Sequence, residues 1–497
     1  MERENTQMIA NGSYISHTIS RVNSVQDVDS VKFWYSRRSV VAFIVALFLV
    51  VQGLSYLIPP FQSPDEFYHL KRAYLLSEGT VALDKKDGVS GGYIDTGLLE
   101  YMSRFKNDRW FRYLPSSPAS DAKLSLAEDV HWTSDVVFSD VPNVAVYFPL
   151  PYIPQAMAFK LGKLMGMTVA SSYYLARSFS LIASLAILCA ACFLYPVSPL
   201  VAALYLMPMT LFQLGSASLD AVSFSTVVLA GALYMRAASK ELTFTPGMLV
   251  LFTLCLFSLA TTRVNLIVLT ILPCVLHSVR RSYRYLVASA TAALLSLSWT
   301  AFSLATVSGG HGNSPEQRSQ IVEHYSHHVG SFFAVVYDTL TNGTLVQFYW
   351  KMFVGVFGWS GIKIVDGGTI QQWGVLLHPV VYMVYAFLLI SMASVTFQWS
   401  RSCSLSRPAL WLLLATLSSA FLILPILLAT WTPQPAKFIY GIQGRYFIPT
   451  TILLSFVLPT VHFSRLRATI SYGILALSAS ISVLATAPTL LAAWWVD

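Results

Sequence analysis

Residues 40–58 read VVAFIVALFLVVQGLSYLI, and residues 59–79, which follow directly, read PPFQSPDEFYHLKRAYLLSEG. The first stretch is apolar and long enough to cross the roughly 30 Å hydrocarbon layer of a bilayer as a helix. The second stretch gathers ionisable side chains where the chain would leave the membrane: Asp65, Glu66, His69, Lys71 and Arg72. The boundary between them therefore points to the fold class and raises the question of function.

The composition of the whole chain agrees with the apolar stretch. Of 497 residues, 55% are hydrophobic and 11% are charged, and the mean hydropathy is +0.59. A soluble domain carries about 25% charged residues. Backbone groups in lipid must be hydrogen-bonded within their own segment, so the apolar segments are predicted to be helices. The sequence thus predicts an all-α polytopic membrane protein.

Apolar segments recur along the chain as candidate membrane spans, roughly 40–58, 149–166, 175–194, 197–213, 218–235, 246–262, 264–279, 284–307, 373–397, 408–431, 446–463 and 469–495. If all crossed, the two termini would lie on one side, but the flanking charges place them on opposite sides. One early segment must therefore not cross fully. Our candidate is 149–166, which contains prolines and lysines; the alternative is that 197–213 is re-entrant. We predict about eleven crossings.

Basic connections set the orientation of the predicted spans. They fall on one side if every span from 218 onward crosses, and that side is cytoplasmic because short cytoplasmic loops are rich in Lys and Arg; they are Arg236/Lys240, Arg280/Arg281/Arg284, Arg401/Arg407 and Arg465/Arg467. Residues 1–39 are predicted to form a disordered cytoplasmic tail before a transmembrane domain at 40–495. Loops 59–148 and 308–372 then lie outside a cell inner membrane. The net charge of +8 reflects the same bias, so we expect no nucleic-acid partner.

The charged stretch begins with a helix signal. Ser63 as N-cap, Pro64 at the first helical position and Glu66 two residues later form a capping box. This interpretation leaves Asp65 without a bond. Asp65, His69 and Arg72 are spaced i, i+4 and i+7, which places them on one helix face. They could serve as a general base with a phosphate-binding partner, or they could form an ordinary solvated face.

Other ionisable residues are predicted at the same outer ends of the spans. Asp220 starts a segment rich in small residues, GSASLDAVSFS, and Arg263 separates two apolar runs in ATTRVNLI. Arg445 follows two close glycines in YGIQGRYFIP, and glycines allow a ligand to approach the backbone. Ionisable groups at membrane depth are costly and often functional. The simpler alternatives are that Asp220 caps a helix and that the arginines reach toward lipid headgroups.

Several of these pieces together carry a family resemblance. The stretch 59–79 resembles the pattern of a family of predicted bacterial membrane proteins of uncharacterised function, which carry Pro-Asp-Glu, His, Arg-Ala and Ser-x-Gly after the first span. Further similar pieces follow in the family's order: YFPLPYIPQAMAFKLG, SASLDAVSFSTVVLAGAL, VFGWSGIKI and GIQGRYFIP. The resemblance covers the chain from about residue 40 to residue 495.

That family resembles the GT-C glycosyltransferases, which take a sugar from a polyprenyl-phosphate donor and carry an acidic residue in the first external loop. The resemblance implies that Asp65 is the base that activates an acceptor hydroxyl, with His69 beside it in the catalytic site. It implies binding of the donor phosphate or substrate by Arg72, Asp220, Arg263 and Arg445. The expected partners are a polyprenyl-phosphate-sugar donor, a cell-envelope glycan or other lipid-linked or surface acceptor, and membrane lipid.

A metal site and a second acidic residue are less well indicated. Some GT-C enzymes use a divalent metal, and the candidate ligands here are Glu323, His324, His327 and His328 in EHYSHHVG. A polar loop with clustered histidines is the preferred interpretation, so no cofactor is assigned with certainty. Four residues of the first external loop compete for the second acidic position: Asp84, Asp87, Glu128 and Asp129.

Two other classes of function are compatible with the sequence. A transporter or flippase for lipid-linked glycans or other solutes would carry charges deep within its spans, whereas most charges here lie near the ends. A glycan polymerase, a ligase or a non-catalytic partner in envelope assembly is the third class. A transfer assay with a polyprenyl-phosphate sugar separates these hypotheses.

Overall fold

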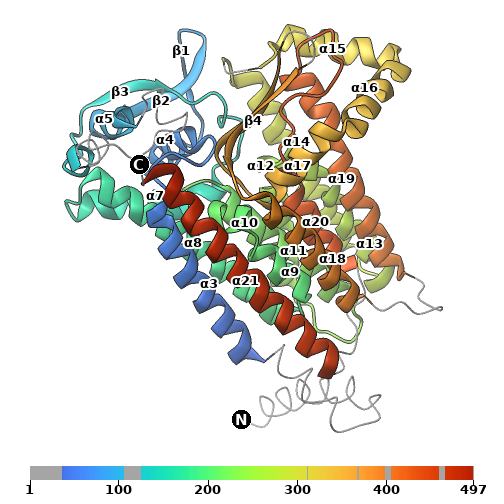
Figure 1. Ribbon diagram of the computed structural model, residues 1–497. Coiled ribbons are helices and arrows are strands. Elements are labelled where there is room, and N and C mark those ends of the chain that lie inside the picture. Colours follow the sequence, from blue (N-terminus) through green and yellow to red (C-terminus); the bar gives the residue numbers. More distant parts are fainter. Residues whose placement is uncertain are drawn as a thin grey trace.

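The computed structural model describes residues 36–105, 125–309, 312–365, 369–397, 405–457 and 465–495. Its helices form a tilted bundle, and smaller helices and two sheets gather at one end of that bundle (Figure 1). The predicted tail therefore lies almost entirely outside the described residues. At its end, Ser36 caps the first helix by accepting a hydrogen bond from the Ser39 amide.

In the described part of the chain, seven helices are long and apolar enough to cross a membrane: α3 (Arg37–Leu57), α8 (Val169–Leu194), α11 (Asp220–Ala238), α14 (Arg284–Thr306), α18 (Pro379–Thr396), α19 (Arg407–Trp431) and α21 (Arg465–Trp494). They support a polytopic membrane protein, as the composition predicts. The count of eleven crossings stays a prediction, because the remaining candidate spans form shorter helices in the structure.

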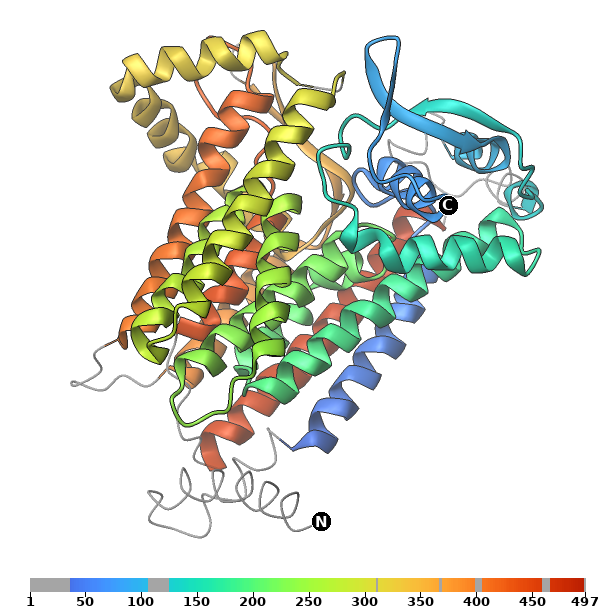
Figure 2. The same cartoon turned by 180° about the vertical axis from the view of Figure 1, so that it is seen from behind.

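The shorter helices of the bundle are α9 (Pro199–Tyr205), α10 (Pro208–Leu214), α12 (Pro246–Thr262), η2 (Val264–Ile271), α13 (Leu272–Arg280) and α20 (Ile448–Val457). The segment 197–213 is thus broken, since α9 ends before α10 begins at Pro208. The segment 149–166 forms η1 (Leu150–Tyr152) and α7 (Ile153–Leu164). A helix of 12 residues spans about 18 Å, well short of the hydrocarbon layer. Figure 2 shows α7 lying across one end of the bundle.

The end of the bundle that carries α7 also carries strands, which the all-α prediction missed. Antiparallel strands β1 (Asp84–Lys86), β2 (Val89–Asp95) and β3 (Val136–Asp140) form one sheet in the order β1-β2-β3. The sheet lies with α4 (Glu66–Ser77) and α5 (Thr96–Arg104), and Gly92 of β2 leaves room for the Leu75 side chain of α4. The first predicted external loop therefore folds into a small α/β cap.

The second predicted external loop is also structured. It forms α15 (Pro315–His327), α16 (Val329–Thr341), α17 (Gly343–Val354) and an antiparallel hairpin of β4 (Val356–Val365) and β5 (Thr369–Leu376). A register shift between Phe357 and Gly361 bends this hairpin. A hydrogen bond of 3.0 Å from the Trp359 indole to the Phe61 carbonyl ties the hairpin to the turn after α3.

The two ends of the membrane domain lie at opposite ends of the bundle. The indole of Trp495, just after α21, donates to the carbonyl of Leu57, the last residue of α3, at 2.9 Å. The end of α21 thus lies beside the end of α3, while α3 itself begins at the far end (Figure 1). This arrangement agrees with the opposite placement of the two ends inferred from the loop charges.

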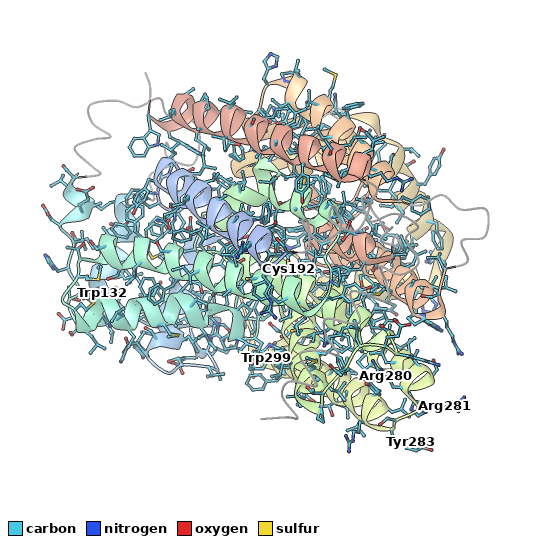
Figure 3. The ribbon with its side chains drawn as sticks, turned by 90° about the horizontal axis from the view of Figure 1, so that it is seen from below. Trp132, Cys192, Arg280, Arg281, Tyr283 and Trp299 are labelled. Carbon is cyan, nitrogen blue, oxygen red and sulfur yellow. The ribbon has the colours of Figure 1, made fainter. Side chains whose placement is uncertain are left out.

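At the far end of the bundle, basic residues close the helix connections. Arg280 donates to the carbonyls of Ala237 and Leu242 at 2.9 and 2.8 Å, so it caps the end of α11. Figure 3 shows Arg280, Arg281 and Tyr283 gathered on the α13–α14 turn. The basic connections around Arg236 and Arg280 therefore share one end, as predicted, whereas residues 401–404 lie outside the described part of the chain.

Helix α11 is the centre of the bundle and is buried along almost its whole length. Its small residues allow close packing: a side chain at Gly231 would lie 2.7 Å from the ring of Phe456 on α20. Small residues at helix contacts are typical of membrane bundles, where van der Waals packing drives association. Because α11 begins at Asp220, this central helix presents a carboxylate at the end that carries the cap.

Candidate functional site

The turn between α3 and α4 places Asp65 in an unusual backbone conformation. Asp65 is the N-cap of α4 and adopts a left-handed conformation, with φ of 62° and ψ of 5°. Its backbone carbonyl accepts hydrogen bonds from the amides of Tyr68 and His69 at 2.9 and 3.0 Å. Its half-buried carboxylate accepts no capping bond, and none of the described residues donates a hydrogen bond to it. Such a conformation costs about 1–3 kcal/mol outside glycine and is concentrated at functional sites.

The helix begins later than the capping box predicts. Helix α4 starts at Glu66, and the Ser63 hydroxyl donates to the Gln213 side chain at 3.2 Å instead of capping the helix. One of the two hydrogen bonds of a capping box is present, because the Ser63 amide donates to the Glu66 carboxylate at 3.4 Å. Asp65 therefore lies outside the helix, which removes the simple i, i+4, i+7 relation on which the sequence argument relied.

Glu66 does much more than begin a helix. Its carboxylate is fully buried and accepts hydrogen bonds from the Tyr173 hydroxyl and the Ala217 amide, both at 2.9 Å. It also pairs with Arg177 at 3.3 Å. Three segments far apart in the sequence, the α3–α4 turn, α8 and the loop before α11, thus meet at one carboxylate.

Arg177 is the residue of this region that sequence reasoning missed. Its guanidinium donates to the carbonyls of Ser55, Ile58 and Pro59 at 2.9, 2.7 and 3.2 Å. The last carbonyls of a helix have no partner within it, so Arg177 satisfies the end of α3 while it neutralises Glu66. A lone arginine in an apolar run was the available signal, since such residues are buried and paired.

The three predicted outer residues of the later spans come together. Arg263 ends α12 and pairs with one carboxylate oxygen of Asp220, and Arg445 pairs with the other oxygen at 3.4 Å. We call Asp220, Arg263 and Arg445 the arginine cluster. Two guanidinium groups share one carboxylate, so the cluster carries one positive charge in excess. Positive charge in excess in a partly buried place favours an anionic ligand.

The glycine before Arg445 has a different role from the predicted one. A side chain at Gly444 would lie 2.0 Å from the Tyr349 carbonyl and 2.3 Å from the Phe353 amide. Gly444 therefore lets η4 (Gly444–Phe447) pack backbone to backbone against α17, rather than admitting a ligand. With that contact made, the Arg445 Nε donates to the Gln443 side chain at 2.7 Å and its Nη1 reaches Asp220.

His69 lies near both Asp65 and the arginine cluster, because the charges of Asp65, Asp220 and Arg445 all act on its ring. Its Nδ1 is 2.6 Å from the Tyr152 hydroxyl, and its ring is parallel to that of Tyr147, with centroids 6.4 Å apart. Burial lowers the pKa of His69 and the charge of Arg445 adds to this, while the carboxylates of Asp65 and Asp220 act in the opposite direction. The net result is a neutral imidazole at neutral pH, held by a tyrosine beside both acids.

Arg72 does not join this group. Its guanidinium donates to the carbonyls of Thr80 and Val81 at 3.5 and 2.6 Å. Burial lowers the pKa of Arg72 to about 10, with the charge of Tyr152 acting in the opposite direction. Because two of its nitrogens donate to the loop after α4, the structure gives Arg72 a supporting role in the cap, and Arg72 does not share a helix face with Asp65, which lies outside α4.

The charge of Asp65 acts on three tyrosines, Tyr68, Tyr147 and Tyr446, so these side chains lie near it. The pKa of Tyr68 is raised by burial and then by the charges of Asp140 and Asp65. The Arg445 guanidinium lies 5.6 Å from the ring centre of Tyr446. Tyr68, Tyr147 and Tyr446 are each half-buried. Three tyrosines and the Arg445 guanidinium thus lie in the neighbourhood of the Asp65 carboxylate.

The metal ligands suggested by the sequence do not assemble here. Glu323 and the histidines lie on α15 or at its end, and the rings of His324 and His328 stack on each other at 4.7 Å. Within the described ranges, no three His, Cys, Asp or Glu side chains are grouped so that they could hold a metal ion. The competing acids of the first loop are exposed and none of them pairs with the arginine cluster: Asp84, Asp87, Glu128 and Asp129.

Comparison with known proteins places the chain in a family. Residues 48–455 match the family described as "Predicted membrane protein (DUF2142)", and the chain belongs to that family. The match covers the Asp65 turn, Glu66, Arg177 and the whole arginine cluster. No curated protein and no solved structure matches the chain.

Proposed function

We propose that this DUF2142 protein is a membrane glycosyltransferase of GT-C type, which moves a sugar from a polyprenyl-phosphate donor to a cell-envelope glycan or other surface acceptor. The carrying observation is the Asp65 carboxylate, which none of the described residues engages by a hydrogen bond, next to arginines that share a single carboxylate. A free base beside excess positive charge is what transfer from a phosphate leaving group requires.

The proposed reaction assigns one task to each group. Asp65 takes the proton from the acceptor hydroxyl, whose oxygen forms a bond with the anomeric carbon of the donor sugar. The bond from that carbon to the phosphate oxygen breaks, and the polyprenyl phosphate leaves with the bonding electrons. Arg263 and Arg445 stabilise the negative charge that grows on the phosphate, and Asp220 holds both arginines in place.

His69 acts through its neighbours in this proposal. As a neutral imidazole it adds no positive charge that would compete for Asp65, and its bond to Tyr152 fixes the ring. Tyr68, Tyr147 and Tyr446 offer aromatic faces and hydroxyl groups to the sugar. The polyprenyl chain would remain in the lipid beside the bundle, and the acceptor would approach from the side of the cap, which we take as the outer face of the inner membrane.

The test is a transfer assay with the full-length protein in phospholipid vesicles and radiolabelled polyprenyl-phosphate sugars as donors. We expect transfer by the wild type and a loss of about 10²–10⁴-fold for Asp65→Asn, the contribution typical of a general base. The matched control is Asp84→Asn, which changes an exposed aspartate on β1. Addition of a chelator tests whether a divalent metal takes part.

The outcomes separate the proposed transferase from the transporter. Transfer by Asp65→Asn at the wild-type rate would refute the assignment of the base. Movement of the donor across the vesicle membrane without transfer would replace the proposal by the transporter or flippase hypothesis.

A further inference from the structure

Helix α16 has three distinct faces. Phe332, Val335, Val336 and Thr339 turn toward the protein and are buried or half-buried. A second set is apolar and yet exposed: Val329 at 52%, Phe333 at 55%, Tyr337 at 67% and Leu340 at 50%. At about 100° per residue, these four side chains fall within an arc of about 80°.

The third face of α16 is small and polar. It carries the exposed residues Gly330, Ser331, Ala334, Asp338 and Thr341, which occupy the arc from about 100° to about 200° on the same projection. A helix in water would not keep four large apolar side chains exposed on one narrow arc, whereas a helix at a bilayer boundary is expected to separate an apolar from a polar face.

Helix α16 packs against the end of an exposed apolar stripe on α19. Helix α19 exposes large apolar side chains at i, i+4, i+7 and i+11, namely Leu410, Leu414, Leu417 and Phe421. This is the pattern of one helix face directed to lipid. The last member of the stripe, Phe421, packs edge to face on Phe332 of α16, with ring centres 6.2 Å apart.

The position of the Phe332–Phe421 contact along α19 is near the boundary of a bilayer. Helix α19 begins at Arg407, and the carbonyl of Pro408 accepts a hydrogen bond from Tyr234 near the basic end of α11. Phe421 lies fourteen residues beyond Arg407, or about 21 Å along the helix. The hydrocarbon layer is about 30 Å thick, so α16 meets α19 in the last third of that layer or just above it.

We propose that α16 is an interfacial helix, with Val329, Phe333, Tyr337 and Leu340 inserted among the lipids at the Asp65 end of the bundle and Asp338 directed to water. The occupant of this apolar face is the bilayer itself, because α16 packs through Phe332 against the end of an exposed apolar stripe on α19 that has the position of a membrane-facing surface. The second predicted external loop is thus attached to the membrane over part of its length.

The placement of α16 has a structural consequence for the arginine cluster. Helix α17 follows α16 after Asn342, and the backbone of η4 packs directly on the backbone of α17 at Gly444. Arg445 is the next residue. A lipid-anchored α16 would therefore fix the depth of Arg445 relative to the headgroups, where the phosphate of a lipid ligand lies.

The first test uses the unmodified protein in phosphatidylcholine vesicles that contain a diazirine-labelled phosphatidylcholine. After irradiation, mass spectrometry should find lipid adducts on α16 at residues 329–340, as on the exposed stripe of α19. Adducts on α19 with none on α16 would overturn the proposal. No mutation is needed, so a failure to fold cannot obscure this result.

The second test compares two faces of α16 by spin labelling. Phe333→Cys and Asp338→Cys are made in a background without the 5 native cysteines, provided that this background keeps the wild-type melting temperature. We expect the ratio of oxygen to nickel-chelate accessibility to be several-fold higher at 333 than at 338. Equal, high chelate accessibility at both positions would place α16 in water. Exclusion of both reagents at 333 would show a protein partner or a second copy of the chain there instead.

Discussion

Two groups of buried charge lie at the same end of the bundle, and they differ in how completely they are satisfied. In the pair of Glu66 and Arg177, the carboxylate has four partners and the guanidinium binds three further carbonyls. In the arginine cluster, two guanidinium groups share Asp220. Both groups join segments distant in the sequence, but only the arginine cluster has one positive charge in excess. We call Glu66 and Arg177 the closed pair, and in contrast to it the arginine cluster is the open cluster.

The difference separates a structural element from a site. A buried ion pair with all its hydrogen bonds made has nothing left to offer a ligand, and its main effect is that neither partner can be removed alone. The arginine cluster can accept one more negative group without loss of its internal pairs. Asp65, adjacent in sequence to Glu66, takes no part in the closed pair and adds a carboxylate that can accept a proton.

The largest stability effect is expected when the closed pair is broken. Arg177→Met strands the Glu66 carboxylate in a fully buried position and removes the cap of α3, so we expect a loss of about 3–5 kcal/mol of unfolding free energy. Thermal unfolding of the purified protein in detergent would show this as a large decrease in melting temperature.

The double variant Glu66→Gln/Arg177→Met provides the control for this prediction. Removal of both charges leaves no uncompensated ion, so part of the lost stability should return. A single variant as stable as the wild type, or a double variant no more stable than Arg177→Met, would show that the ion pair of Glu66 and Arg177 does not stabilise the fold as described.

The open cluster should respond in binding more than in stability. Arg445→Gln removes the excess charge and one charge-assisted hydrogen bond to an anionic ligand, which is worth about 1.5–3 kcal/mol. We therefore expect polyprenyl phosphate to bind about 10–150-fold more weakly, measured by thermophoresis in detergent. Arg281→Gln, at the opposite end of the bundle, is the matched control. Equal weakening by both substitutions would mean a nonspecific effect of net charge.

Sequence reasoning found the members of the open cluster more easily than those of the closed pair. Asp220, Arg263 and Arg445 each stand near the end of an apolar segment, so the topology places them on one side without knowledge of their contacts. The contact itself joins residues 225 positions apart and depends on the fit of η4 against α17. No pattern local to the sequence contains that information.

The closed pair and Arg72 show the opposite limitation. The capping box already explains an acidic residue at position 66. Nothing in the local sequence therefore indicates its contact with Arg177, 111 positions away. Arg72 was grouped with Asp65 because a regular helix was assumed from Ser63 onward. The left-handed conformation of Asp65 delays the helix to Glu66, and one residue outside the helix is enough to invalidate a face assigned by spacing.

The backbone contact that positions the open cluster can be tested directly. In Gly444→Ala, the added carbon would lie 2.0 Å from the Tyr349 carbonyl, so η4 must move away from α17. We expect a loss of about 1–3 kcal/mol of unfolding free energy, as for overpacking in a core. Gly473→Ala, in α21, has no atom within 4 Å and should be neutral or stabilising by up to about 1 kcal/mol. Similar melting temperatures for both variants would contradict the tight contact at Gly444.

The smallest expected effect concerns His69, which lies beside the open cluster. Burial keeps the pKa of His69 below its ordinary value, so below about pH 6.5, the usual pKa of histidine, the unfolded chain binds a proton that the folded chain resists. Stability should therefore decrease as the pH falls below that value.

In His69→Gln, the decrease in melting temperature between pH 7.5 and pH 5.5 should be smaller than in the wild type. His324→Gln, on the exposed helix α15, should retain the wild-type decrease. If His69→Gln loses as much stability on acidification as the wild type, burial does not hold the imidazole neutral in the folded protein.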